Sequence, residues 1–211
     1  MKMRVLGVDP AAAGPTGYGV VETDGRDCRA LLFGTLRRSP RARRSDFPGR
    51  LREIHSLMAR LVREFSPDAV AIEAVFTALN IKTALKLAEV RGVVQLAAAQ
   101  GNVPVHSYSP REVKSTVAGY GQASKHQMQQ MVRAWLGLRR PPEPADAADA
   151  LAVALCHIHA SQARARWAVA TASRARPESP GGRAKRAGGG PDSSGRGKHI
   201  RLRASRIQTK R

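Results

Sequence analysis

RVLGVDP, residues 4–10, is a short apolar run that ends in a carboxylate and a proline. Val and Leu in such a run predict a strand, and Pro10 marks the turn that follows it. A second run, AVAIE at residues 69–73, also ends in an acid. Because it is apolar throughout, it fits a strand buried in the centre of a sheet. The two runs therefore predict two strands that carry Asp9 and Glu73 at their carboxyl ends.

The chain around these two runs alternates strand and helix patterns. Strands are predicted at 17–21, 30–35 and 103–108, and helices at 48–65, 80–100, 110–118, 124–136 and 145–163. Ser109 with Glu112 and Ser124 with Gln127 are expected to form capping boxes. This order is a three-strand meander followed by strand–helix alternation. It predicts an α/β fold with a mixed sheet and helices on both faces.

Charge is distributed unevenly along the 211 residues. The chain has 36 Lys and Arg against 16 Asp and Glu, and its formal net charge is +20. Residues 162–211 contribute +12 of this and lack an amphipathic apolar stripe, so nucleic acid is a better partner than a membrane surface. From about residue 170 the composition is Gly, Pro, Ser and Arg, which predicts disorder. We expect a folded domain at 1–163 and a basic, disordered tail at 164–211.

Cysteine content and hydropathy bear on the cellular compartment. Cys28 and Cys156 are far apart and show no zinc-ligand spacing. The N-terminus has no secretion-signal core, and no apolar run approaches the roughly 20 residues that span a bilayer. We therefore expect a soluble protein of a reducing cytoplasm.

Asp146 and Asp149 complete a set of four acids with Asp9 and Glu73. They are three residues apart at the start of the last predicted helix, so they share one helical face. Mg²⁺ and Mn²⁺ prefer carboxylate oxygens, and a two-metal phosphodiesterase holds its ions roughly 4 Å apart. The acids would converge if the first and fourth strands are neighbours. The alternative is that Asp9 is a turn residue and Asp146 a helix cap.

Several segments together resemble the bacterial RuvC Holliday-junction resolvases over about residues 3–159. They are Gly7–Pro10, Thr16–Val20, Ala71–Phe76, Asn80, Ala84–Leu87, Arg91-Gly92, Val113-Lys114, Gly119, Gly121, Lys125 and Ala145–Ala152. The resemblance implies an RNase H-like fold, a homodimer and Mg²⁺-dependent hydrolysis, with two ions per active site. It implies paired symmetric nicks in four-way DNA junctions that leave 5′-phosphate and 3′-hydroxyl ends, in homologous recombination and DNA repair. It also implies a RuvA–RuvB type branch-migration partner and a bacterial, nucleoid-associated location.

The resemblance assigns roles to individual residues. Asp9, Glu73, Asp146 and Asp149 match the family's metal-binding acids, Lys114 and Lys125 its functional lysines, and Phe76 an aromatic that meets DNA bases. Asn80, Lys82, Lys86 and Arg91 follow Phe76 and are expected to contact DNA. Solvated lysines and a core Phe76 remain the alternatives. His126, His157 and His159 are expected to be structural or surface residues, because hard metals prefer oxygen ligands.

One loop departs from the family pattern. Residues 11–15 read AAAGP, so the family's Gly-Ser-Arg is replaced and the loop before Thr16 is longer. A noncatalytic junction-binding protein that lost cleavage through this loop therefore stays open. An RNase H-like nuclease acting on RNA is a second alternative, against which Phe76, Lys114 and Lys125 argue. The Ala- and Leu-rich helix 80–100 fits either the core or a dimer face, and its small residues favour the dimer face.

Overall fold

The computed structural model describes residues 2–37, 46–74 and 80–174, which belong to one compact unit, Met1–Ala175. The elements are β1 (Met3–Asp9), β2 (Thr16–Thr23), β3 (Cys28–Leu36), α1 (Phe47–Phe65), β4 (Ala69–Glu73), α2 (Ile81–Gln100), β5 (Val105–Tyr108), α3 (Pro110–Ala118), α4 (Lys125–Trp135) and α5 (Ala145–Arg174). Their order confirms the predicted alternation. Within these residues, no helix has a stretch long and apolar enough to cross a membrane.

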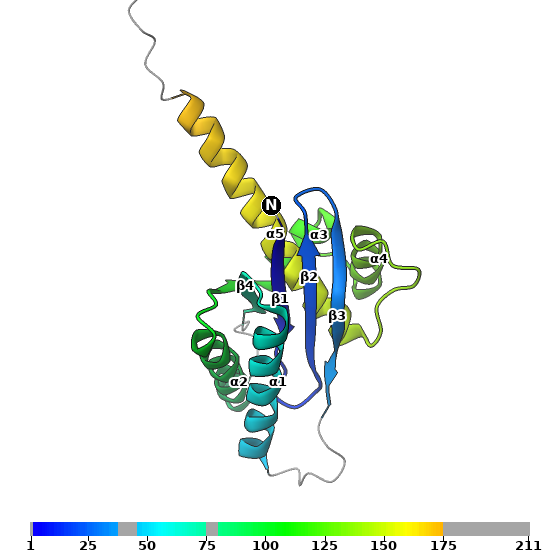
Figure 1. Ribbon diagram of the computed structural model, residues 1–211. Coiled ribbons are helices and arrows are strands. Elements are labelled where there is room, and N and C mark those ends of the chain that lie inside the picture. Colours follow the sequence, from blue (N-terminus) through cyan, green and yellow to red (C-terminus); the bar gives the residue numbers. More distant parts are fainter. Residues whose placement is uncertain (1, 38–45, 75–79, 175–211) are drawn as a thin grey trace, which may run out of the picture. The chain divides into compact units, whose positions relative to one another are not determined.

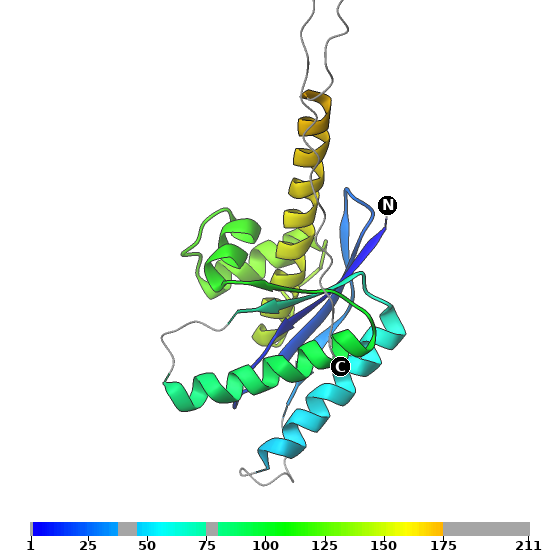
Figure 2. The ribbon, with the colours of Figure 1, turned by 90° about the vertical axis from the view of Figure 1, so that its left-hand side faces the viewer.

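The five strands form one mixed sheet in the order β3-β2-β1-β4-β5. β1, β2 and β3 are a meander of antiparallel strands, whereas β4 runs parallel to β1 and β5 parallel to β4. Figures 1 and 2 show α1 and α2 on one face of this sheet and α3, α4 and α5 on the other. β1 and β4 are neighbours, as the convergence of the acids requires.

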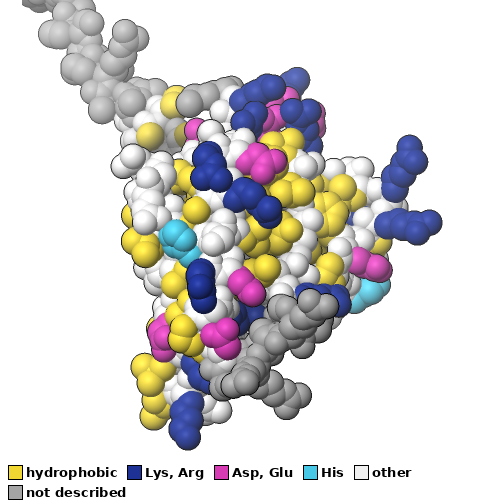
Figure 3. Space-filling view, turned by 60° about the horizontal axis from the view of Figure 1, so that its bottom comes forward, with side chains coloured by type: hydrophobic (Ala, Val, Ile, Leu, Met, Phe, Trp, Pro, Cys, Tyr) yellow, Lys and Arg dark blue, Asp and Glu magenta, His cyan; other side chains and the backbone are white. Residues whose placement is uncertain are grey.

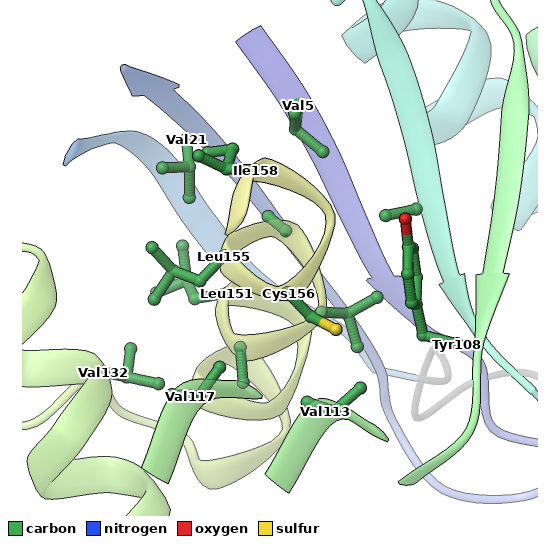
Figure 4. Close-up of a cluster of buried hydrophobic side chains, with 14 of the residues drawn as sticks. Val5, Val21, Tyr108, Val113, Val117, Val132, Leu151, Leu155, Cys156 and Ile158 are labelled. Atoms are coloured by element: carbon green, nitrogen blue, oxygen red, sulfur yellow. The ribbon is translucent and has the colours of Figure 1, made fainter. Parts of the chain in front are cut away.

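Alternation along β1 supplies both hydrophobic cores. Leu6 and Val8 pack with α1 and α2, whereas Val5 faces the core that α5 builds. In that second core, Leu151, Leu155 and Ile158 of α5 lie between the strands and the apolar faces of α3 and α4 (Figure 4). Helix α5 is therefore buried between the sheet and two other helices, which makes its N-terminal half a rigid support.

Local signals in the sequence account for the helix boundaries. Both predicted capping boxes are present: Ser109 with Glu112 begins α3, and Ser124 with Gln127 begins α4. The side chain of Asp46 accepts a hydrogen bond from Gly49 N at the start of α1, and Pro48 lies in its first turn.

Helix α5 is longer than predicted. It continues to Arg174, whereas the sequence indicated an end near Ala163. Residues 163–174 are rich in alanine and arginine, both strong helix formers, and the next proline is Pro177. The charge of this segment led to its assignment to the tail, although its helix propensity is high. The rest of the tail, for which we predicted disorder, lies outside the residues that the structure describes.

Candidate active site

Two of the four acids stand side by side because their strands end together. β1 and β4 are parallel, and Val8 is in register with Ile72, so Asp9 and Glu73 are the next residues on adjacent strands. Burial of the apolar part of both strands fixes this register, because a slip of one residue would turn each side chain to the other face.

Helix α5 approaches this edge of the sheet unusually closely. A Cβ on Gly7 would overlap the Ala150 carbonyl, and one on Gly17 would overlap the Asp146 carbonyl. Gly7 and Gly17 both belong to the sheet face that α5 covers, and Gly17 is paired with Asp9. The absence of side chains on these glycines therefore lets the start of α5 lie directly against the strand that carries Asp9.

Three of the acids meet at this contact. Oxygen atoms of Asp9, Asp146 and Asp149 all lie within 4.8 Å of one another, and all three side chains are partly buried. Glu73 is adjacent, since its carboxyl group and that of Asp9 each shift the pKa of the other. The structure thus brings together all four acids that the sequence indicated.

Electrostatics at the cluster favour an added cation. Burial and the neighbouring Glu73 raise the pKa of Asp9 to about 8, and Asp149 and Asp146 add to this rise. Burial also raises the pKa of Glu73, although Lys114 and Lys125 partly oppose the change. A carboxyl group with such a high pKa lies where negative charge is insufficiently compensated. This half-buried set of oxygen donors therefore fits hard divalent cations such as Mg²⁺ or Mn²⁺.

The two predicted lysines flank the cluster. Lys125 Nζ lies 3.0 Å from Asp149 Oδ2, and this hydrogen bond raises the pKa of Lys125. Lys114 projects from α3, and its charge lowers the pKa of Glu73, so it lies close to that acid. Both lysines are thus placed beside the carboxylates.

The unusual loop after Asp9 is held by a buried arginine. Nη2 of Arg50, on α1, is within hydrogen-bonding distance of the Ala11 carbonyl (3.1 Å), the Gly14 carbonyl and Thr16 Oγ1 (3.3 Å). The side chain of Arg50 is only 3% exposed. The alanines of this loop have no polar side chains, so Arg50 fixes the loop through its backbone.

Arg91, which the sequence predicted to contact DNA, contacts β4 and β5 of this chain. Its guanidinium donates to the carbonyl oxygen of Glu73 and to Ser107 Oγ at 2.9 Å. Burial lowers the pKa of Arg91, in keeping with its position against the sheet. Arg91 therefore ties α2 to the end of β4 from which Glu73 projects.

The other predicted DNA contacts lie along α2 or outside the described residues. Asn80 caps α2 by accepting a hydrogen bond from Thr83 N at 2.8 Å. Lys82 and Lys86 are exposed, and Lys86 Nζ lies 5.6 Å from the centre of the Phe47 ring. Phe76 lies outside the described residues, so its role stays a prediction.

The histidines are structural or exposed, as expected. Burial lowers the pKa of His157 to about 4, and its Nδ1 is 2.8 Å from the Tyr108 hydroxyl. His159 stacks edge-on against Trp135, and His126 is exposed. These three histidines do not belong to the acidic cluster.

Arg50 and Arg91 carry a signal that the sequence analysis missed. Arg50 has i, i+4, i+7 spacing with Ile54 and Leu57, and Arg91 has i, i+3 spacing with Val94. Each arginine thus lies on the apolar, buried face of its helix. A cation on such a face needs buried hydrogen-bond acceptors, which here are main-chain carbonyls beside the acids.

Comparison with known proteins agrees with this geometry. A family model of the crossover junction endodeoxyribonuclease RuvC matches residues 5–157. This chain belongs to the RuvC family. RuvC of Salinispora arenicola is 45% identical over 175 residues, which cover 82% of this chain and 97% of that protein. RuvC of Syntrophomonas wolfei is 44% identical over 157 residues, which cover 74% of this chain and 89% of that protein.

A solved RuvC structure shares the fold. Thermus thermophilus RuvC in complex with a Holliday junction substrate is 36% identical, with a TM-score of 0.71. The alignment covers 77% of this chain and 96% of that one. The RNase H-like fold expected from the sequence is thereby confirmed.

Proposed function

We propose that this chain is a Mg²⁺-dependent endonuclease that resolves four-way DNA junctions by paired symmetric nicks. The observation that carries the proposal is the convergence of Asp9, Asp146 and Asp149 within 4.8 Å, with Glu73 alongside, in a chain of the RuvC family. The products are 5′-phosphate and 3′-hydroxyl ends, which can be ligated during recombination and repair.

The four acids are proposed to hold two ions, with Mn²⁺ as a substitute for Mg²⁺. Such ions, when bound, supply an activated water and stabilise the leaving oxygen. Lys114 and Lys125 stand where they can stabilise negative charge that builds on the scissile phosphate. Lys125 also donates a hydrogen bond to Asp149.

The substrate is proposed from charge and from the family. Figure 3, in which the bottom of Figure 1 is turned forward, shows Lys and Arg side chains among hydrophobic patches and interspersed acids, on a chain whose net charge is +20. A polyanion is attracted by such a surface, and its affinity falls steeply with salt. Phe76, Asn80, Lys82 and Lys86 are proposed to contact the junction, and the basic tail to add nonspecific contacts.

A homodimer is proposed from helix α2. Ile81, Leu85 and Leu96 of this helix are 77%, 61% and 53% exposed, although each is a large apolar side chain. Covering them with a second α2 would bury this surface and place two active sites on one junction, as paired nicks require. A RuvA–RuvB type complex is the proposed branch-migration partner, in the bacterial cytoplasm at the nucleoid.

Substitution of the acids tests the proposal. Asp9→Asn and Glu73→Gln keep the side-chain shape but remove metal-binding charge, so we expect loss of nicking on a synthetic four-way junction with Mg²⁺. Junction binding should persist in both variants, and Asp24→Asn, on the β2–β3 turn, should cut normally. Normal nicking by either active-site variant would refute the metal-site assignment.

The same assay separates the alternatives. Binding of the junction by the unaltered protein without nicks would support a noncatalytic junction-binding protein. Cleavage of RNA in preference to the junction would support a ribonuclease.

A further inference from the structure

A groove opens beside the segment that joins the two active-site lysines. It has a volume of about 420 Å³ and lies where the α3–α4 turn meets α4. Ala118, Ala123 and Met131 are its apolar residues, and all three contact or belong to the hydrophobic core. Its volume is within the ~300–1,000 Å³ typical of small-ligand sites.

Tyr120 forms an aromatic wall of this groove. It is 54% exposed, yet the turn that carries it is well fixed. Gly119 adopts φ 74°, which ends α3 in the left-handed region, and Ala123 N donates to the Tyr120 carbonyl at 3.2 Å. Trp135 Nε1 donates to the Val117 carbonyl at 3.0 Å, which ties the end of α3 to α4. The backbone beside the tyrosine is thus hydrogen-bonded, and the Tyr120 hydroxyl donates to Gln122 Oε1 at 3.4 Å.

The rim of the groove is polar. His126, Gln127 and Gln130 of α4 line it, and no Asp, Glu, Lys or Arg is among the lining residues. Amide and imidazole groups can both donate and accept hydrogen bonds. A phosphate would find no cation here, whereas the edge of a heterocycle would find matching polar groups.

The groove adjoins the catalytic cluster through the chain itself. Lys125, whose Nζ contacts Asp149, directly precedes the rim residue His126. Tyr120 lies between Lys114 and Lys125, both of which act on the acids electrostatically. One step along the chain therefore separates the lysine at the acids from the rim of the groove.

We propose that this groove binds one unstacked nucleobase of the junction strand near the scissile phosphate. Tyr120 stacks on the base, Ala123 and Met131 contact its apolar surface, and Gln130 meets its polar edge. Stacking of a base on an aromatic side chain tolerates any base, whereas hydrogen bonds to its edge discriminate among bases. The groove thus contributes to junction affinity through Tyr120 and to the choice of cleavage sequence through the rim. This inference rests on the proposed junction substrate.

The test is a double-mutant cycle that combines substitution of Tyr120 with the removal of single bases from the junction. In the full-length Asp9→Asn protein, which holds the junction without cutting it, Kd is measured for intact junctions and for junctions with one abasic nucleotide, scanned across the crossover. We expect one abasic position to weaken binding about 5- to 100-fold. Tyr120→Ala should show the same weakening on the intact junction and no further loss at that position. Tyr120→Phe should retain affinity, because the ring remains.

Controls and the cleavage readout complete the test. Trp167→Ala removes another exposed aromatic, on the C-terminal part of α5, and should leave Kd and the abasic response unchanged. In the protein that retains Asp9, nicking rates are compared among junctions that differ only in the base at the position found by the abasic scan. Gln130→Ala should make these nicking rates more alike. If the abasic nucleotide weakened binding equally in Asp9→Asn proteins with and without Tyr120→Ala, the proposal would be overturned. Because this cycle needs no cleavage, an absence of nicks would count against the proposed function and leave the base site standing.

Discussion

Gly17 lies so close to Asp146 that the Asp146 carbonyl occupies the space where a Cβ on Gly17 would be. Gly17 is also the partner of Asp9 across the β1–β2 ladder. One residue without a side chain therefore fixes the separation between the acid on the strand and the acids on the helix.

Gly17→Ala should damage both stability and metal binding. The new methyl group forces the start of α5 away from the sheet, and we expect the free energy of unfolding to fall by about 1–3 kcal/mol. Mn²⁺ affinity, measured by titration calorimetry, should fall as Asp146 and Asp149 move from Asp9. Gly92→Ala, where a Cβ meets nothing within 4 Å, should preserve both properties. Native Mn²⁺ affinity in Gly17→Ala would contradict this account.

Stability without metal should fall as pH rises from about 4 to about 8. In this window the folded protein keeps a proton on Asp9, whose pKa is about 8, whereas the unfolded chain, with a pKa of 3.8, does not. The folded state binds more protons, so the free energy of unfolding decreases with pH. At about 1.4 kcal/mol per pKa unit, the shift of Asp9 corresponds to a decrease of up to about 6 kcal/mol. Glu73, whose pKa is also raised, acts in the same direction.

Thermal unfolding in chelator across this pH range measures the effect. Asp9→Asn should flatten the pH dependence and be more stable than the native protein at pH 8. Added Mg²⁺ should raise the native Tm most at high pH, because bound ions replace the proton. A native Tm that rises from pH 5 to pH 8 in chelator would exclude this protonation scheme.

Lys125→Gln should separate metal binding from catalysis. The ammonium group lies 3.0 Å from Asp149, so its removal takes positive charge from the site and should leave Mn²⁺ affinity equal or higher. The rate of nicking at saturating junction should fall by about 10-fold or more, because the same charge stabilises the transition state. Lys82→Gln, which replaces an exposed lysine of α2, should change neither the Mn²⁺ affinity nor the nicking rate at saturating junction. Weaker Mn²⁺ binding by Lys125→Gln would show that the lysine mainly orients Asp149.

The sequence was sufficient to predict the sheet and its order of elements, because apolar runs and capping boxes mark the element ends locally. The four acids that it indicated lie together in the fold, and their role as metal ligands stays a prediction. It was not sufficient for the approach of α5, since Gly7 and Gly17 act through a contact with residues more than 125 positions away. The roles of Arg50 and Arg91 depend on carbonyl groups that only the folded chain presents to them. The end of α5 was misplaced because charge was given more weight than helix propensity.

Arg91→Met should act on Glu73 rather than on DNA. Loss of the guanidinium leaves the Glu73 carbonyl and Ser107 Oγ without this donor, which should lower the free energy of unfolding by about 1–3 kcal/mol. Junction binding measured against salt discriminates the two roles. A phosphate contact would reduce the slope of log K against log salt by about 0.9, whereas a structural brace leaves it unchanged.

Arg50→Met should loosen the loop at residues 11–15. Carbonyl groups of Ala11 and Gly14 lose their buried donor, so we expect the free energy of unfolding to fall by about 2–4 kcal/mol. The saturated nicking rate should also fall, since the loop directly follows Asp9. Arg52→Met, two residues along on the exposed face of α1, is the matched control for both measurements. An unaltered nicking rate in Arg50→Met would show that the loop does not influence the acids.

Because Arg50 binds loop carbonyls, the side chains of the loop remain replaceable. This accounts for an AAAGP sequence directly beside the acid cluster. It also offers a place for a reporter group: Ala13 is exposed, whereas Cys28 is half-buried and Cys156 buried. A fluorophore on a cysteine at position 13 would sit a few residues from Asp9 and could follow the arrival of a DNA strand in real time.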